Sequence, residues 1–138
     1  MTYAVLVLAL LLSAPAWAAG VKTNFMDHSN DVLIDEATAK AVMNEAIPAK
    51  VWKVYPASKY VFLSQVEGGV NAARTCVVAA RVIVLPLTTT AKAVLFRPQK
   101  TATAYDAKAE SSTDQCRALA KQKLKEATNA VVSAIVKT

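Results

Sequence analysis

The chain has 138 residues and carries a formal net charge of +6 at pH 7. This length fits one domain, which at this size buries roughly two-thirds of the surface that its unfolded chain exposes. With three glycines and one histidine, the sequence has no glycine-rich loop to hold phosphate and no zinc motif that needs a second imidazole.

The N-terminus has the pattern of a secretory signal peptide. An uninterrupted apolar run covers residues 4–12 and is too short to span a bilayer as a mature helix. Ala16-Trp17-Ala18 follows with the small residues that signal peptidase requires. No Lys or Arg precedes the apolar run, which departs from the usual pattern, and an N-terminal membrane anchor is the alternative. We expect cleavage after Ala18 or Ala19, so that residues 1–19 form a cleaved signal peptide.

This leader places residues 20–138 in the periplasm or outside the cell, as a single small exported domain. From Val21 to Ile47 the acidic residues outnumber the lysines, so the positive charge is concentrated in the rest of the chain. Such a charge favours an anionic envelope component as a partner, or it serves only solubility. Nucleic acid is not an expected partner because export separates the domain from it. No second segment is long enough to span a membrane.

The first predicted helix covers Glu36 to Ala46. Asp35 is a suitable N-cap, and apolar residues recur at steps of three and four along one face. This stripe consists of Ala39, Val42, Met43, Ala46 and Ile47. Pro48 ends the helix. Residues 21–30 show no period and predict a mobile or loosely docked lead-in, and residues 31–34 predict a short extended piece.

Two strands are expected after this helix. Residues 51–55 are rich in aromatic and β-branched side chains and lie between two prolines, which predicts a short edge strand. Residues 60–66 predict a second strand. Glu67-Gly68-Gly69 then predicts a tight turn into an antiparallel partner, because glycine adopts the positive φ that the turn needs.

Residues 74–85 form the longest predicted strand. One face is uniformly apolar and is expected to face the core; it consists of Cys76, Val78, Ala80, Val82 and Val84. The other face carries Arg81 and is expected to be partly solvated or partly covered. Thr88–Thr90 predicts a corner, after which residues 92–96 and 99–105 continue as extended chain interrupted by Pro98. Residues 106–111 predict a polar linker.

The last predicted helix opens with the capping box Ser112-x-x-Gln115. Its apolar stripe consists of Cys116, Leu119, Ala120, Leu124, Ala127, Val131, Ala134 and Ile135. Cys116 therefore points toward the sheet face that carries Cys76, and in an exported protein these two cysteines are most simply one disulfide. Two free buried thiols are the alternative. Together the elements predict an α+β fold: an antiparallel sheet of about three to five strands packed against an N-terminal helix and a longer C-terminal helix.

Two sets of side chains are candidate binding sites. The basic side chains on the outer face of the last helix are Arg117, Lys121, Lys123 and Lys125. They would dock an anionic partner, whereas a solvated helix face is the alternative. Trp52, Tyr55 and Tyr60 would form an exposed aromatic patch for a ligand, whereas ordinary packing is the alternative.

Catalytic chemistry is not expected from this sequence. His28, beside Asp27, is the only histidine and lies outside the predicted rigid core. The serines have no nucleophile-elbow context, and the carboxylates are explained by helix starts, turns and linkers. No catalytic residue, metal site or cofactor is therefore assigned.

The sequence as a whole predicts a non-catalytic exported binding or accessory protein that acts through protein contacts or an anionic envelope component. An inhibitor or immunity protein that neutralises a toxin or hydrolase is the first alternative, and it predicts a tight stoichiometric partner. A small hydrolase is the second alternative, and it predicts that His28→Ala abolishes activity.

Overall fold

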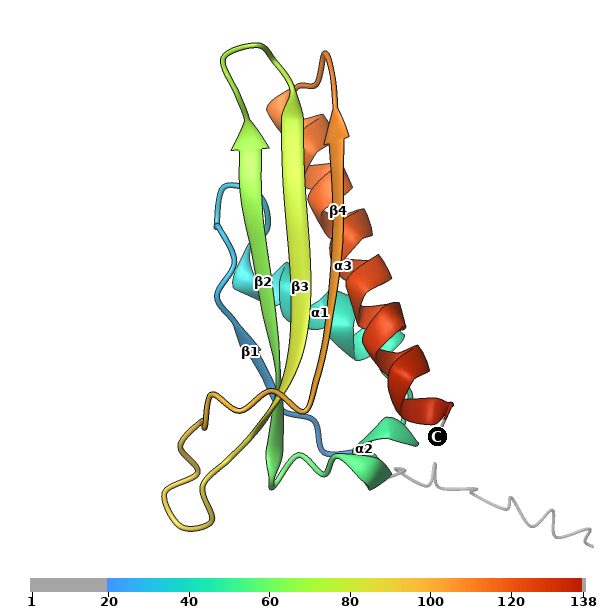
Figure 1. Ribbon diagram of the computed structural model, residues 1–138. Helices are drawn as coiled ribbons and strands as arrows, with labels where there is room; N and C mark the ends of the chain where they lie inside the picture. The colour runs from blue at the N-terminus through green and yellow to red at the C-terminus, as the bar shows by residue number, and fades with distance from the viewer. Residues whose placement is uncertain (1–19, 138) are drawn as a thin grey trace, which may run out of the picture.

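The computed structural model describes residues 20–137, which form a four-stranded sheet with its two longer helices on one face (Figure 1). In chain order the elements are β1 (Phe25–Asp27), α1 (Glu36–Ala46), α2 (Val51–Val54), β2 (Tyr60–Val70), β3 (Cys76–Pro86), β4 (Lys100–Lys108) and α3 (Thr113–Val136). The strands lie side by side in sequence order. The α+β prediction is confirmed, but the wholly antiparallel sheet is wrong because β1 runs parallel to β2. The predicted signal peptide at residues 1–19 lies outside the described residues.

The segment 21–30, expected to be mobile or loosely docked, contains β1. The Phe62 amide donates to the Asn24 carbonyl (3.0 Å), and the ring of Phe25 packs edge-on against Trp52 with centroids 5.5 Å apart. Residues 31–34, expected to be extended, instead form a turn in which the Asn30 side chain accepts the Val32 amide (3.0 Å). A three-residue strand shows no periodicity, so the sequence carried no signal for it.

Residues 51–55 contain the short helix α2, and the predicted edge strand is wrong. Val51 and Trp52 are both buried although they are neighbours in sequence. A strand would send these two side chains to opposite faces, whereas a helical turn brings both onto the core. The Tyr55 amide closes the turn by donating to the Val51 carbonyl (2.9 Å). Burial therefore overrides the β-propensity of this segment.

The turn between β2 and β3 lies at Asn71–Thr75, not at Glu67–Gly69 as expected. The Asn71 amide donates to the Thr75 carbonyl (3.0 Å), and the Thr75 amide donates to the Asn71 side chain (2.9 Å). The glycines lie inside β2, where Gly68 has φ +127°. A Cβ at this position would lie 1.9 Å from the Val77 carbonyl oxygen. Close approach of two backbones, not a turn, requires glycine here.

The connection between β3 and β4 differs from the predicted corner and strand. Residues 92–96 form no strand, and Leu87 and Val94 make one isolated bridge. The Lys92 ammonium ties the connection to the rest of the fold by donating to the Ser58 carbonyl (3.0 Å). The strand that follows continues to Lys108, so β4 takes up the first half of the segment predicted as a linker.

The sheet has two unequal apolar layers. On the helix side, the predicted inward row of β3 is confirmed, since Cys76, Val78, Ala80, Val82 and Val84 are all fully buried. These side chains pack against α1 and α3. On the other side, a small cluster of Val61, Leu63, Ile83 and Leu85 is buried beneath Met26, Leu87 and Val94. The rest of this second face is left uncovered by the described residues.

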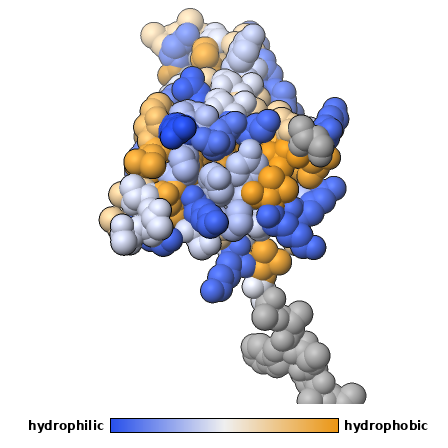
Figure 2. Space-filling view, turned by 60° about the horizontal axis from the view of Figure 1, so that its bottom comes forward, coloured by the Kyte–Doolittle hydropathy of each residue, from blue (hydrophilic) through white to orange (hydrophobic). Residues whose placement is uncertain are grey.

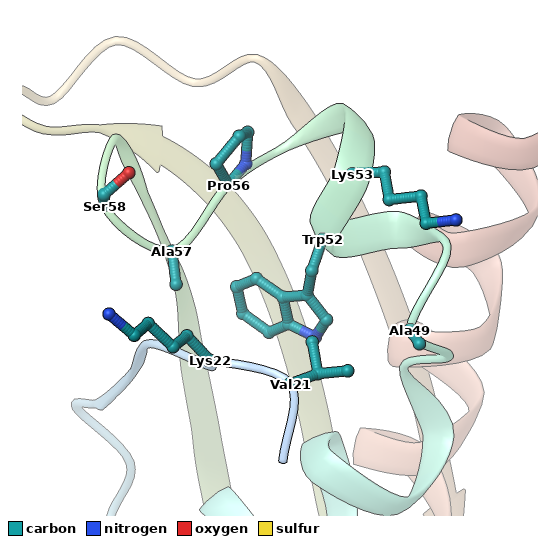
Figure 3. A pocket seen from close by; sticks show the side chains of 8 residues that line it. All are labelled: Val21, Lys22, Ala49, Trp52, Lys53, Pro56, Ala57 and Ser58. Atoms are coloured by element: carbon teal, nitrogen blue, oxygen red, sulfur yellow. The ribbon is translucent and has the colours of Figure 1, made fainter. Parts of the chain in front are cut away.

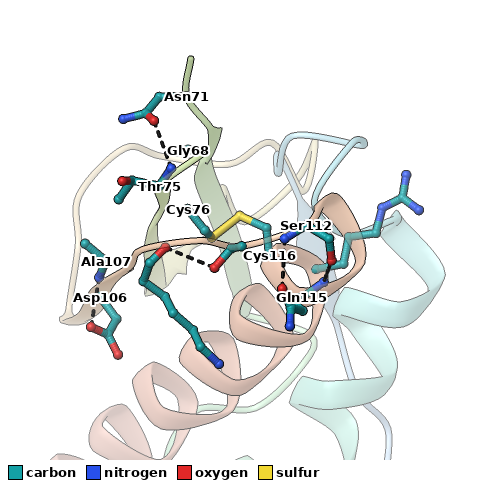
Figure 4. The surroundings of a disulfide bond; sticks show 12 residues. Gly68, Asn71, Thr75, Cys76, Asp106, Ala107, Ser112, Gln115 and Cys116 are labelled. Carbon is teal, nitrogen blue, oxygen red and sulfur yellow. Dashed lines mark hydrogen bonds between the residues drawn. A yellow bond between two sulfur atoms is a disulfide. The ribbon is translucent and has the colours of Figure 1, made fainter. Parts of the chain in front are cut away.

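The capping box and the disulfide fix the start of α3 (Figure 4). The Ser112 hydroxyl accepts the Gln115 amide, and the Gln115 side chain accepts the Ser112 amide. The predicted bond between Cys76 and Cys116 is confirmed, with Cα atoms 5.5 Å apart. In the predicted stripe of α3, Ala134 is exposed rather than buried, and Thr128 is buried instead with its hydroxyl bonded to the Leu124 carbonyl (2.7 Å). Within residues 20–137 no helix is both long and apolar enough to cross a bilayer.

Candidate functional site

The uncovered half of the sheet is the candidate site, and the pairing of β2, β3 and β4 fixes its layout. Three cross-strand rows face outward. The register places Gln65, Arg81 and Thr103 in one row, Glu67, Ala79 and Tyr105 in the next, and Gly69, Val77 and Ala107 in the last. Neighbouring rows lie about 7 Å apart along the strands, because like-facing residues alternate along a strand. We call this set of residues the open face.

A hollow of 240 Å³ lies at the centre of the open face, lined by Gln65, Glu67, Ala79, Arg81 and Thr103. Ala79 forms its floor because a methyl group leaves space between the longer side chains of the adjacent rows. Tyr105 stands directly opposite Ala79 in the register and is 79% exposed. An aromatic ring this exposed beside a hollow is the kind of anchor that protein interfaces bury.

The open face carries both signs of charge without neutralising them. Glu67 and Arg81 lie in adjacent rows of β2 and β3, and both are exposed. Neither side chain takes part in an ion pair within residues 20–137. Both charges are therefore free to pair with groups on a partner.

The basic residues predicted as one face of α3 divide into two groups. Arg117, Lys121 and Lys125 are exposed and follow one another at four-residue steps, so they share one side of the helix. Lys121 also lines a hollow of 350 Å³ between α3 and α1, together with Glu45. The Arg117 side chain donates to the Val32 carbonyl (2.8 Å), which ties α3 to the turn before α1.

Lys123 lies on the other side of α3, against β4. Six residues separate it from Arg117, which corresponds to about 240° around the helix. Its ammonium lies 2.7 Å from a Glu126 carboxylate oxygen and 3.8 Å from an Asp106 oxygen, and its side chain is only 12% exposed. The hydrogen bond to Glu126 raises the pKa of Lys123. Lys123 is therefore engaged within the protein, and the helical period could have shown that it does not align with the other three.

The aromatic residues of the predicted patch lie inward. Trp52 is 7% exposed and packs edge-on against Phe62, with ring centroids 5.0 Å apart. Tyr55 and Tyr60 are half-buried and stack edge-on against each other at 4.9 Å. All three side chains therefore make packing contacts within the protein.

A shallow pocket of 370 Å³ borders Trp52 at the end of the molecule that holds α2 (Figure 3). Lys22 and Lys53 line it but extend away from the indole in different directions. The pocket therefore lacks the convergent polar groups that orient a small ligand. Exposed apolar side chains at this end are Val21, Val54, Leu95 and Phe96. Figure 2, which turns this end toward the viewer, shows hydrophobic surface divided into patches by hydrophilic side chains.

His28 is exposed at the end of β1, and its amide donates to the Ser64 carbonyl (2.9 Å). The neighbouring Asp27 carboxylate accepts the hydroxyls of Ser29 (2.5 Å) and Ser64 (2.6 Å). Ser64 is fully buried, so this network joins β1 to β2 through a hydroxyl that solvent does not reach. Within the described chain, no group of three His, Cys, Asp or Glu side chains is placed to hold a metal ion.

No protein-family model matches this sequence, and no curated protein matches it significantly. Among solved structures the chain is similar to PelC from Paraburkholderia phytofirmans, solved as a dodecamer, with a TM-score of 0.44 and 14% identity over 85% of this chain and 91% of that one. A single-residue variant of PelC gives a TM-score of 0.45 and 14% identity over 86% and 94%. A protein of the family DUF330 from Xanthomonas campestris gives 0.41 and 12% identity over 89% of each chain. No function is carried over from these proteins.

Proposed function

We propose that this chain is a non-catalytic exported protein that binds another protein through the open face. The observation that carries the proposal is the half-uncovered sheet, in which Arg81 and Glu67 line a hollow together with Ala79. The exposed Tyr105 is the cross-strand partner of Ala79. Tyrosine and arginine are enriched at the centres of protein interfaces, and a protein partner can supply both charge signs to match Arg81 and Glu67.

Export is supported by the disulfide as well as by the leader pattern. The bond between Cys76 and Cys116 joins two fully buried sulfurs. Structural disulfides persist in the periplasm and outside the cell, whereas the cytosol keeps thiols reduced. A periplasmic or secreted accessory protein is therefore the proposal that fits both features.

The test is recovery of a partner from the extract of the compartment to which the protein is exported. Tagged protein, expressed with its own leader, is purified alongside the variants Arg81→Glu and Tyr105→Ala, and co-eluting proteins are identified by mass spectrometry. Arg97→Glu is the matched control, because Arg97 is exposed in the β3–β4 connection and changes the net charge equally. We expect a partner with wild type and Arg97→Glu that is lost with both open-face variants. Retention of the partner by Arg81→Glu and Tyr105→Ala would refute the open face as the site.

An anionic envelope component is the second candidate partner, and the line of Arg117, Lys121 and Lys125 on α3 supports it. The sharp test is Lys121→Glu/Lys125→Glu, with Lys53→Glu/Lys59→Glu as a control of the same charge change at exposed positions. Lys123 is left unchanged because reversing it would break its contacts with Glu126 and Asp106. Envelope association at low salt that is weakened equally by both double variants would reflect net charge alone.

The inhibitor or immunity alternative uses the same open face and differs in the partner. It predicts a one-to-one complex in which the partner loses activity. Measuring the activity of the purified partner as this protein is titrated in distinguishes an inhibitor from an accessory protein, since an accessory protein leaves the partner active at saturation.

A further inference from the structure

Strand β4 is an edge of the sheet whose outer side no described strand covers. It is nine residues long and α3 lies behind it, on the helix side of the sheet (Figure 1). A long edge strand presents a row of unpaired amides and carbonyls, which is a template for another strand.

Backbone groups of successive strand residues point alternately to the two neighbouring strands. This alternation shows which residues of β4 present unpaired groups. The Leu87 amide donates to the Lys59 carbonyl (2.8 Å), so odd-numbered residues of β3 bond to β2. Even-numbered residues of β3 therefore bond to β4, as the Val84 carbonyl does when it accepts the Gln99 amide (2.9 Å). Even-numbered residues of β3 pair with even-numbered residues of β4. The outward amides and carbonyls of β4 thus belong to its odd-numbered residues, because bonding direction alternates along a strand.

The odd-numbered residues of β4 are Thr101, Thr103, Tyr105 and Ala107. The Ala107 amide is already capped, since it donates to the Asp106 carboxylate (2.8 Å; Figure 4). The amides of the other three point away from β3, and within residues 20–137 they donate to no side chain and to no loop carbonyl. The available edge is therefore symmetric about Thr103.

We propose that two copies of this chain associate through β4, paired antiparallel with the two Thr103 residues facing each other on a two-fold axis. Thr101 of each copy then faces Tyr105 of the other, and roughly six backbone hydrogen bonds form across the edge. Such a contact is self-complementary, as a two-fold interface must be. The two sheets join into one, and this proposal does not depend on the identity of any other partner.

Charge selects this register over its neighbour. With Thr103 at the centre, Lys100 of each copy faces Asp106 of the second copy on the helix side of the sheet. Asp106 is exposed enough to accept it, with a side chain that is 52% exposed despite its contact with Lys123. Moving the centre to Ala104 would place Lys100 opposite Lys108 of the second copy and require the capped amide of Ala107. Opposite charges directly across a strand pair stabilise it, and like charges destabilise it.

The first test measures mass against concentration. Protein expressed with its own leader and recovered with its disulfide intact is examined by sedimentation equilibrium at roughly 1–500 µM, a range that covers the Kd of small interfaces. We expect a monomer–dimer equilibrium. Lys100→Glu should raise the dimer Kd by roughly tenfold, because it turns two attractive pairs into repulsive ones. Lys59→Glu is the matched control and should leave the Kd unchanged. A monomer across the whole range would overturn the proposal.

The second test reads the register directly. Thr103→Cys places two thiols opposite each other on the axis, whereas the thiols of Tyr105→Cys would lie about 14 Å apart, four residues along the strand. Mild oxidation should cross-link Thr103→Cys into dimers and leave Tyr105→Cys monomeric. Equal cross-linking of both variants, or none of Thr103→Cys in a sample that sediments as a dimer, would overturn this register. Both positions are exposed, so the fold tolerates both substitutions.

Discussion

Glycine at position 68 is required by the neighbouring strand rather than by a turn. Its own φ is +127°, and the Val77 carbonyl occupies the space where a side chain would begin. Gly69 shares a positive φ of +148° but has open space around the same position. Substitution of Gly68 would therefore cause both steric overlap and backbone strain, whereas substitution of Gly69 would cause backbone strain alone.

We predict that Gly68→Ala lowers the free energy of unfolding by about 3 kcal/mol, since overpacking adds to the strained φ. Gly69→Ala, the control, should cost about 1 kcal/mol from strain alone. Urea denaturation followed by circular dichroism measures both. Equal losses for the two variants would contradict the steric explanation.

Asp35 caps α1 as a carboxylate. The Thr38 amide (2.8 Å) and the Thr38 hydroxyl (2.9 Å) both donate to it, and these bonds lower the pKa of Asp35. Because the folded-state pKa lies below the unfolded one, the resulting stability is present above the unfolded pKa and is lost as pH falls through the folded pKa.

The pH titration of Asp35, followed by NMR, should therefore give a pKa below the ordinary value for aspartate. Asp35→Asn keeps an acceptor for the Thr38 amide but does not titrate. It should remove this part of the acid dependence of stability while preserving α1. Thr38→Val should move the pKa of Asp35 upward, since it removes the hydroxyl donor. An unshifted pKa in the wild type would contradict the capping role.

At the scale of elements, one covalent bond and one short helix determine how the layers meet. The disulfide joins the first residue of β3 to the first turn of α3 across 40 residues. At the opposite end of the molecule, α2 inserts Trp52 between Phe25 of β1 and Phe62 of β2. The helix layer is therefore fixed covalently at one end of the sheet and by aromatic packing at the other.

Removal of the disulfide as Cys76→Ala/Cys116→Ala should lower the free energy of unfolding by about 4 kcal/mol, on the loop-entropy estimate for a loop of this length. Chemical denaturation at neutral pH measures the loss. Wild-type protein unfolded in the presence of reductant should show a loss of similar size. A double variant as stable as the oxidised wild type would contradict this account.

Trp52→Ala should cost roughly 3–5 kcal/mol, because it removes a large buried ring from two aromatic contacts. Trp52→Phe is the conservative control and should retain most of the stability, since an aromatic ring stays between Phe25 and Phe62. Thermal unfolding monitored by circular dichroism compares the variants. A loss below 1 kcal/mol for Trp52→Ala would show that α2 does not anchor this end of the core.

The elements that the sequence predicted correctly are those with long periods or fixed capping chemistry. The stripes of α1 and α3, the capping box at Ser112 and the inward row of β3 repeat often enough to be read without tertiary information. The predictions are wrong where contacts between segments distant in sequence determine the local structure. β1 depends on a parallel neighbour, α2 on burial of Trp52, and Gly68 on the carbonyl of Val77.

The candidate site was only partly visible in the sequence. Alternation in β3 placed Arg81 on a face that was partly solvated, and the structure confirms this. Which half of that face is covered depends on how Leu87 and Val94 fold back over Ile83 and Leu85, and no local pattern in residues 87–99 encodes it. Tyr105 was assigned to a strand, but its place opposite Ala79 follows only from the register.

At the scale of the whole molecule, the two faces of the sheet have different roles. One face is packed against α1 and α3 and supplies most of the core, whereas the other is buried only near one end. Residues on the open face therefore contribute little to folding and are available for binding. This division allows binding and stability to be separated by mutation.

Tyr105→Ala and Arg81→Ala should each change the free energy of unfolding by no more than about 0.5 kcal/mol, because both side chains are exposed. Val82→Ala, at the adjacent but fully buried position, should cost about 2 kcal/mol and serves as the contrasting control. Thermal unfolding compares the three variants. A large loss for Tyr105→Ala would mean that the open face is part of the core after all.

The position of the disulfide also determines which end of α3 unfolds first. The bond holds its first turn covalently, whereas the later turns, as far as Val136, are held without a covalent bond, by side-chain packing and by contacts such as that between Lys123 and Asp106. Opening fluctuations must therefore begin at the C-terminal end and advance toward Cys116, which remains tethered even in the most open forms. Amide hydrogen exchange should slow progressively from Val136 toward Cys116, and this gradient should flatten when the bond is reduced.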